Sequence, residues 1–135
     1  MRVDEEKVFA ALVVDDSMLI RHTVCRFLED RGFSVESATN GMEALERLKQ
    51  HIPDVIITDM DMPKMSGSAL IRALKADLRT AGIPLIALAG KSSGAEDAQQ
   101  RANFAIFKDI DIEDQLEKAL QAVLGSKAVG KCTGL

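Results

Sequence analysis

Tryptophan and tyrosine are absent from this sequence of 135 residues, and the lysines and arginines are scattered rather than clustered. The formal net charge is −4. Nucleic-acid binding needs a clustered basic face, and single-strand binding usually needs stacking rings as well. The sequence therefore argues against direct nucleic-acid binding by this domain.

Cysteine and long apolar runs are also scarce. Cys25 and Cys132 are the only cysteines, and they are too few and too far apart for a zinc site or a disulfide framework. No apolar run approaches the length that crosses a bilayer, and residues 1–7 are charged and lack the features of a secretory signal. We therefore expect a cytoplasmic protein without membrane association.

The residues that are present suit one compact domain. Hydrophobic residues make up 47% of the chain and charged residues 28%, a balance that supports a buried core and argues against disorder. The length also fits a single domain. We predict a folded domain over residues 1–125, followed over 126–135 by a flexible tail or a truncated linker.

Short apolar runs alternate with segments of helical periodicity. The runs have the character of strands buried on both faces of a parallel sheet, and they cover 8–14, 33–38, 55–58, 84–89 and 104–107. Four helical faces lie between or after them: Ile20, Val24, Phe27 and Leu28; Ala44, Leu45 and Leu48; Ile71, Leu74 and Leu78; and Ile112, Leu116, Ala119, Leu120 and Val123. The segment 92–102 is the weakest predicted helix, because its inward face offers mainly alanine.

The alternation of strands and helices determines the expected fold class. Ser17 and Asn40 are predicted N-caps, and Gly32 is placed where a helix would end. Strictly alternating elements imply right-handed crossovers and a parallel sheet with helices on both faces. We therefore predict an α/β protein, a three-layer α/β/α sandwich with a five-stranded parallel sheet. In such sheets ligands bind at the carboxyl ends of the strands.

Four charged residues directly follow predicted strands. Asp15 and Asp16 follow the first strand, Asp59 the third, and Lys108 the fifth, so we expect all four at one edge of the sheet. Taken singly, each aspartate is explained as a turn-former or an N-cap, and the lysine as a solvated side chain. Carboxylates packed together repel one another unless a cation is bound. The four together therefore favour a site for a metal ion and a phosphate.

Mg²⁺ suits this arrangement because it prefers oxygen ligands and is commonly held by one or two carboxylates plus a phosphate. We expect Asp16 and Asp59 as direct ligands, Asp15 as a ligand through water, and the backbone carbonyl of Asp61 as a further ligand; Mn²⁺ can substitute. The metal, Lys108 and backbone N–H groups would offset the charge of an incoming phosphoryl group. Asp59 is the predicted nucleophile, which forms an acyl phosphate.

These residues resemble the response regulator receiver domains of two-component signalling. The matching stretches are Val13-Val14-Asp15-Asp16-Ser17 with Arg21, the segment 53–63 from Pro53 through Asp59 to Pro63 with Met65 and Gly67, the segment 83–88, and Lys108. The likeness runs from about residue 8 to residue 124. It implies a flavodoxin-like strand order of 2-1-3-4-5 and a phospho-acceptor at Asp59. It also implies a histidine kinase or histidine phosphotransfer protein as donor, and an acceptor that phosphorylates and dephosphorylates itself rather than a turnover enzyme.

Three positions depart from the family pattern. Ala89 stands where the family has Thr or Ser, so a hydrogen bond to the phosphoryl group worth roughly 1.5 to 3 kcal/mol is missing. Ala105 stands at the aromatic switch position. Lys108 is followed by Asp109 instead of proline, which disfavours the usual cis bond because cis bonds are rare outside proline. We predict a chemically competent receiver with an unconventional output.

Four further residues each allow a functional and a purely structural interpretation. Asp61 and Lys91 occupy the positions that tune the lifetime of the phosphoryl group in the family, but two solvated side chains contributing under about 1 kcal/mol explain them equally well. Phe104 and Phe107 offer an aromatic ring close to the switch position. A core or partly covered strand position is the preferred interpretation for both phenylalanines.

Other functional classes stay open. Asp59-Met60-Asp61 is similar to the acid pair of haloacid dehalogenase-type phosphatases, but the other acidic pair precedes it and Pro63 follows closely. A receiver-shaped interaction module with a phosphorylation-independent output is a second alternative. A flavin or dinucleotide binder is disfavoured because acids follow the first strand. The sequence leaves open the cognate kinase, the downstream effector, and whether the chain forms a homodimer.

Overall fold

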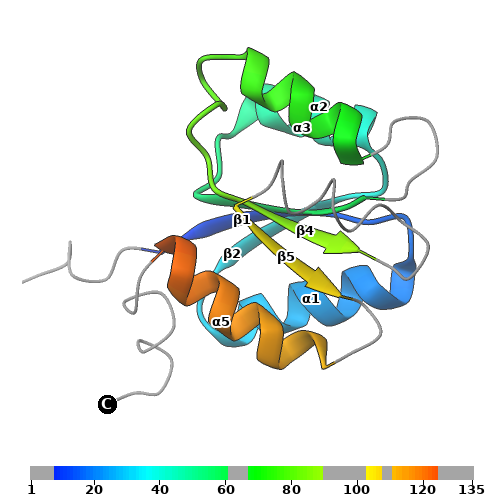
Figure 1. The fold of residues 1–135 in the computed structure, drawn as a ribbon, viewed down its shortest axis with the longest axis vertical. Coiled ribbons are helices and arrows are strands. Elements are labelled where there is room, and N and C mark those ends of the chain that lie inside the picture. Colours follow the sequence, from blue (N-terminus) through cyan, green and yellow to red (C-terminus); the bar gives the residue numbers. More distant parts are fainter. Residues whose placement is uncertain (1–7, 61–66, 90–102, 108–110, 125–135) are drawn as a thin grey trace, which may run out of the picture.

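Five parallel strands form the centre of the molecule (Figure 1). The computed structural model describes residues 8–60, 67–89, 103–107 and 111–124. The strands are β1 (Ala10–Val14), β2 (Ser34–Ala38), β3 (Val55–Asp59), β4 (Leu85–Ala89) and β5 (Phe104–Phe107). They pair in the order β2-β1-β3-β4-β5, and every pair is parallel. The predicted sheet and its order are confirmed.

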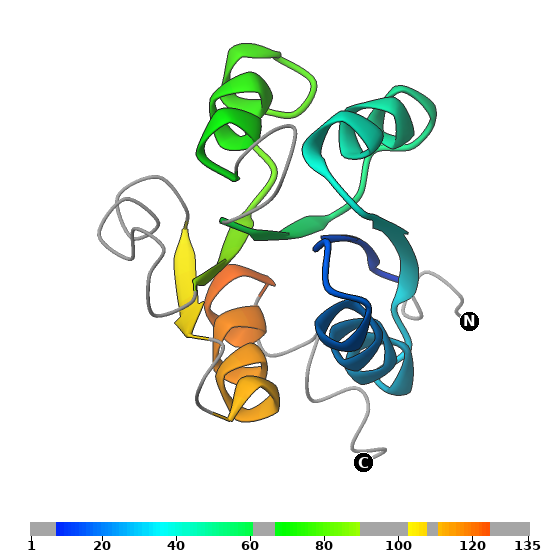
Figure 2. The ribbon, with the colours of Figure 1, turned by 90° about the vertical axis from the view of Figure 1, so that its right-hand side faces the viewer.

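Helices cover both faces of this sheet. The described helices are α1 (Met18–Asp30), α2 (Gly41–Gln50), α3 (Gly67–Ala76) and α5 (Ile112–Leu124). Helices α1 and α5 lie on one face, and α2 and α3 on the other (Figure 2). Within the described segments, no helix combines the length and the apolar character needed to span a bilayer. The helix predicted over 92–102 lies outside the described residues.

Two separate cores result from this layering. Side chains alternate along each strand, so Val13 and Ile57 pack with α1 and α5 while Val14 and Ile56 pack with α2 and α3. All five residues of β3 and of β4 are buried. Burial on both faces is the physical reason that the central strands read as unbroken apolar runs. Strand β2 differs, because it lies at the sheet edge and alternate residues along it are exposed.

Local capping supports two of the helices as predicted. The Ser17 hydroxyl accepts a hydrogen bond from the Ile20 N–H at 3.3 Å, and the Asn40 side chain accepts one from the Glu43 N–H at 2.9 Å. At the end of α1, the Gly32 N–H donates to the Glu29 carbonyl and the Phe33 N–H to the Leu28 carbonyl, both at 3.0 Å. This bond pair is a Schellman motif, which places Gly32 at φ +86.

Gly32→Ala is expected to lower the free energy of unfolding by about 1 kcal/mol, because a side chain strains the left-handed backbone. A methyl group at either Gly32 or Gly82 would meet no atom within 4 Å beyond its own and the two adjoining residues, and only Gly32 of the two has a left-handed φ. Gly82→Ala is therefore the matched control and is expected to leave stability unchanged or slightly higher. Urea denaturation measures both variants, and equal losses would contradict the assignment of strain to Gly32.

One predicted core position is wrong. Ile71 and Leu74 are each 1% exposed, as expected of the apolar face of α3, but Leu78 is 95% exposed. The helix ends at Ala76, and the chain then turns, with the Thr80 N–H donating to the Asp77 carbonyl at 3.0 Å. Because the helical period stops before Leu78, that side chain leaves the buried face.

Candidate metal and phosphate site

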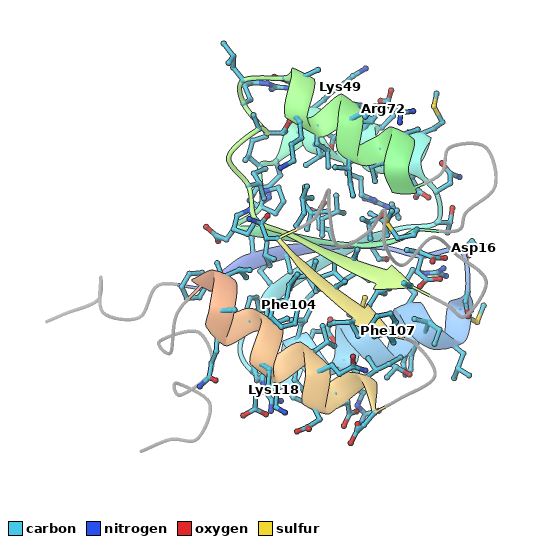
Figure 3. The ribbon with its side chains drawn as sticks, in the orientation of Figure 1. Asp16, Lys49, Arg72, Phe104, Phe107 and Lys118 are labelled. Carbon is cyan, nitrogen blue, oxygen red and sulfur yellow. The ribbon has the colours of Figure 1, made fainter. Side chains whose placement is uncertain are left out.

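Three aspartates meet at the carboxyl ends of β1 and β3. These strands are direct neighbours, with Val14 opposite Thr58, so the residues that follow emerge side by side. Carboxylate oxygens of Asp15, Asp16 and Asp59 all lie within 4.8 Å of one another. Figure 3 shows Asp16 on the side of the molecule toward which the strand arrows point. The expected gathering of the three acids at one edge is confirmed.

The three acids differ in their exposure to solvent. Asp15 is 0% and Asp59 1% exposed, whereas Asp16 is exposed. Two of the carboxylates are therefore largely removed from water, and the third lies at the mouth of the site. Close anionic groups with little solvent around them repel strongly, because the effective dielectric constant is low there.

The turn that carries Asp15 is tied down from several sides. Oδ1 of Asp15 accepts a hydrogen bond from the Ser17 N–H at 2.8 Å, and the Asp15 N–H donates to the Ala38 carbonyl at 3.1 Å. The Arg21 guanidinium donates to the Asp15 carbonyl at 2.8 Å. Arg21 thus holds the backbone of this turn. The sequence marked Arg21 as part of the motif, but its contact was not predicted, because it depends on a side chain folding back from the first turns of α1.

Asp59 is the last residue of β3, which lies between β1 and β4 in the sheet. The next residue, Met60, donates its N–H to the Leu88 carbonyl of the β4 strand at 3.0 Å, and the Thr58 hydroxyl donates to the Asp59 carbonyl at 3.1 Å. The nucleophile candidate therefore lies on a central, fully buried strand rather than on a loop. A rigid strand limits the geometries that its carboxylate can adopt.

The donor set of this cluster fits a hard divalent cation. All three side chains offer carboxylate oxygen, and no sulfur or imidazole belongs to the cluster in the described part of the chain. Oxygen-only ligands are the set that Mg²⁺ and Mn²⁺ prefer, whereas zinc and copper sites usually include nitrogen or sulfur. The residues present therefore match the predicted metal.

The remaining predicted site residues divide into two groups. Asp61, Lys91 and Lys108 lie outside the described residues, so their roles stay predictions. Ala89 and Ala105 are described: Ala89 ends β4 with 0% exposure, and Ala105 is partly buried in β5.

The two phenylalanines of β5 lie at its opposite ends (Figure 3). Phe104 is partly buried and packs against the core on the α1 and α5 side. This confirms the preferred interpretation of Phe104 as a core or partly covered strand residue. Phe107 is partly buried and lies in register with Ala89 on the neighbouring strand. Of the two phenylalanines in β5, Phe107 is therefore the one that lies beside Ala89, the position where the family has a hydroxyl side chain.

Comparison with known proteins decides the family. A family model for the response regulator receiver domain matches residues 11–121. This chain belongs to that family. The receiver is similar to PilH of Pseudomonas aeruginosa, with 33% identity over 116 residues that cover 84% of this chain and 95% of PilH. It also resembles the chemotaxis response regulator CheY4 of Vibrio cholerae, with a TM-score of 0.77, 32% identity, and coverage of 87% of this chain and 99% of that one.

One relative is considerably longer than this chain. Response regulator Rre1 of Synechocystis is 35% identical over 126 residues, which are 91% of this chain but 54% of Rre1. The receiver thus spans about half the length of Rre1. Receiver domains are signalling modules of two-component systems and not small-molecule turnover enzymes. Family membership therefore favours the receiver interpretation over the phosphatase and dinucleotide-binding alternatives.

Proposed function

We propose that this receiver accepts a phosphoryl group on Asp59 beside a bound Mg²⁺ ion and signals through protein–protein contacts. The observation that carries the proposal is the cluster of the Asp15, Asp16 and Asp59 carboxylates within 4.8 Å. Receiver domains bind Mg²⁺ at an acidic pocket of this kind. An acidic cluster with two buried members is costly to fold unless a cation or a proton offsets its charge.

Each residue has a distinct task in this proposal. Asp16 and Asp59 would bind the metal directly, Asp15 would bind it through water, and the carbonyl of Asp61 would complete the protein ligands, with Mn²⁺ as a substitute ion. When bound there, Mg²⁺ would offset the negative charge of the acids and of the phosphoryl group. Ser17 and Arg21 hold the turn that aims Asp15.

The chemical step is a phosphoryl transfer onto a carboxylate. An oxygen of Asp59 attacks phosphorus, a bond from that oxygen to phosphorus forms, and the bond from phosphorus to the donor breaks. For a phosphohistidine donor the leaving group is the imidazole nitrogen. Lys108 neutralises charge on the transferred group, and later attack by water on phosphorus regenerates Asp59. Asp61 and Lys91 tune the rate of that hydrolysis.

A histidine kinase or a histidine phosphotransfer protein is the proposed donor, because relatives of the response regulator type imply such partners. A cytoplasmic location is part of the same proposal. The division into a receiver over residues 1–125 and a tail or linker over 126–135 belongs to the same proposal. The downstream effector and any homodimer are left unassigned.

A phosphorylation-independent output is the second candidate. It is favoured by Ala89 and Ala105, which lack the hydroxyl and the ring through which the family couples phosphate to conformation. Comparing partner binding by the native chain and by Asp59→Ala separates the two functions. Equal binding with and without a phosphodonor would support the second candidate.

Incubation with acetyl phosphate and Mg²⁺ is expected to add the mass of one phosphoryl group to the native chain. The reason is that the metal and Lys108 offset the charge of the donor as it approaches the acids. Intact-mass spectrometry measures the gain, and EDTA in place of Mg²⁺ is expected to prevent it. An unchanged mass in the presence of Mg²⁺ would count directly against Asp59 as an acceptor.

A further inference from the structure

The side-chain amide of Gln115 bonds to both backbone groups of Phe107 at the end of β5. The Phe107 N–H donates to Gln115 Oε1 at 3.1 Å, and Gln115 Nε2 donates to the Phe107 carbonyl at 2.9 Å. Strand β5 lies at the sheet edge, with β4 as its neighbour. The amide of Gln115 therefore satisfies the two backbone groups of Phe107, which a further strand would otherwise satisfy at this position.

The same residue also holds the start of α5. Gln115 Nε2 lies 3.3 Å from the carbonyl of Asp111, and the Gln115 N–H donates to that carbonyl, also at 3.3 Å. Asp111 in turn accepts a hydrogen bond from the Asp114 N–H at 3.5 Å through its own side chain. Phe107 and Asp111 are the described residues on either side of Lys108 in the sequence. One side chain thus restrains the backbone both before and after the segment that contains Lys108.

This restraint matters because the chain has Asp109 after Lys108 where the family has proline. A proline ring limits the backbone at that step, and aspartate does not. We propose that Gln115 is a positioning residue, which holds the end of β5 in the arrangement from which Lys108 reaches the phosphoryl group. The inference rests on the proposed function, in which Lys108 binds phosphate, and it adds a residue that acts through that lysine.

A purely structural role for Gln115 is the competing explanation, and the chain contains a control for it. At the opposite end of β5 the Leu85 N–H donates to Asn103 Oδ1 at 2.8 Å, and the Asn103 N–H donates to the Leu85 carbonyl at 2.9 Å. Asn103 is therefore a second amide that anchors β5, at the end remote from the acidic cluster. Loss of either amide loosens the strand, but only loss of Gln115 loosens it next to Lys108.

Gln115→Met is expected to lower the rate of phosphorylation by acetyl phosphate about tenfold, because methionine has a similar length but cannot bond the backbone of Phe107. The Mg²⁺ dissociation constant is expected to stay the same, since the metal ligands follow β1 and β3. Hydrogen exchange of the Phe107 amide should become faster. Gln115→Glu keeps the acceptor and loses the donor, so an intermediate rate is expected.

Two comparisons separate positioning from general loosening. In the Lys108→Ala background, adding Gln115→Met is expected to slow phosphorylation no further, because the lysine through which it acts is gone. Asn103→Leu is expected to lower the melting temperature while phosphorylation stays within twofold of the native rate. Circular dichroism establishes that each variant is folded before its rate is measured.

The possible results are distinguishable. Three results would overturn this inference while leaving the proposed function in place. They are a native phosphorylation rate for Gln115→Met, a slowing by Gln115→Met that is as large in the Lys108→Ala background as in the native chain, and a slowing by Asn103→Leu as large as that by Gln115→Met. If Gln115→Met does not fold, a native rate for Gln115→Glu overturns it. Absence of phosphorylation in the native chain, or no effect of Lys108→Ala, would instead overturn the proposed function and with it this inference.

Discussion

Asp59→Asn is expected to abolish phosphorylation of the chain by acetyl phosphate. The asparagine amide is a poor nucleophile and removes one of the three carboxylates that form the proposed metal site. No mass gain is expected under conditions in which the native chain is labelled. Intact-mass spectrometry with Mg²⁺ present measures this directly.

The same substitution is expected to stabilise the fold when no divalent cation is present. Asp15 and Asp59 are buried at one rim with Asp16, so removal of one charge relieves repulsion of about 1 to 3 kcal/mol. Mg²⁺ should raise the melting temperature of the native chain and raise that of the variant much less. Thermal melts with EDTA and with Mg²⁺ give both quantities.

Asp54→Asn is the matched control for this variant. Asp54 lies just before β3, and its side chain accepts a hydrogen bond from the Ala10 N–H at 2.8 Å, at the end of the sheet opposite the acidic cluster. Its substitution is expected to leave phosphorylation and the Mg²⁺ response intact. Persistent labelling of Asp59→Asn, or loss of labelling in Asp54→Asn, would contradict the site assignment.

Ile57→Ala is expected to lower the free energy of unfolding by about 2 to 5 kcal/mol. Ile57 is 0% exposed in the centre of β3, in register with Val13 on one side and Ile86 on the other. The substitution removes buried apolar surface and leaves a cavity, because the two neighbouring strands and the helices beyond them restrict relaxation. Ile57→Val should cost only about 0.5 to 1.5 kcal/mol.

Leu78→Ala supplies the control on the surface. Leu78 is 95% exposed, so its truncation removes little buried area and is expected to change stability by less than about 0.5 kcal/mol. Urea denaturation of the three variants measures the differences. A loss for Leu78→Ala as large as that for Ile57→Ala would mean that Leu78 is buried in solution after all.

Several features of the fold and the site were predictable because they depend on local chemistry. Burial on both faces makes Val55 to Asp59 an apolar run that ends in an acid, and parallel strands bring their carboxyl ends to one edge. That rule predicts Asp59 beside Asp15 and Asp16, and the distances between their carboxylate oxygens agree. Capping by Ser17 and Asn40 was predictable for the same reason, since a cap is a contact over three residues.

The errors and omissions arise where a distant contact or a local turn overrides the pattern. Leu78 continues the apolar period of α3 in sequence, but the turn after Ala76 carries it into solvent. Strand β2 was expected to be buried on both faces, yet its position at the sheet edge exposes alternate residues. The turn after Ala76 is not visible in the apolar period of α3. The exposed positions of β2 do have a signal in the sequence, because polar Ser34 and Glu36 alternate there with less polar neighbours.

The amino-acid sequence alone determined the alternation of elements, the three acids at the strand ends, and the departures at Ala89 and Ala105, because each is a property of residue type and spacing along the chain. Only the tertiary structure decided that Arg21 holds the turn of Asp15 and that Gln115 bonds both backbone groups of Phe107 at the end of β5. The physical reason is that both are long side chains whose contacts depend on the tertiary packing around them. A flexible side chain can satisfy many backbone groups, and the packing of the surrounding elements selects which one it meets.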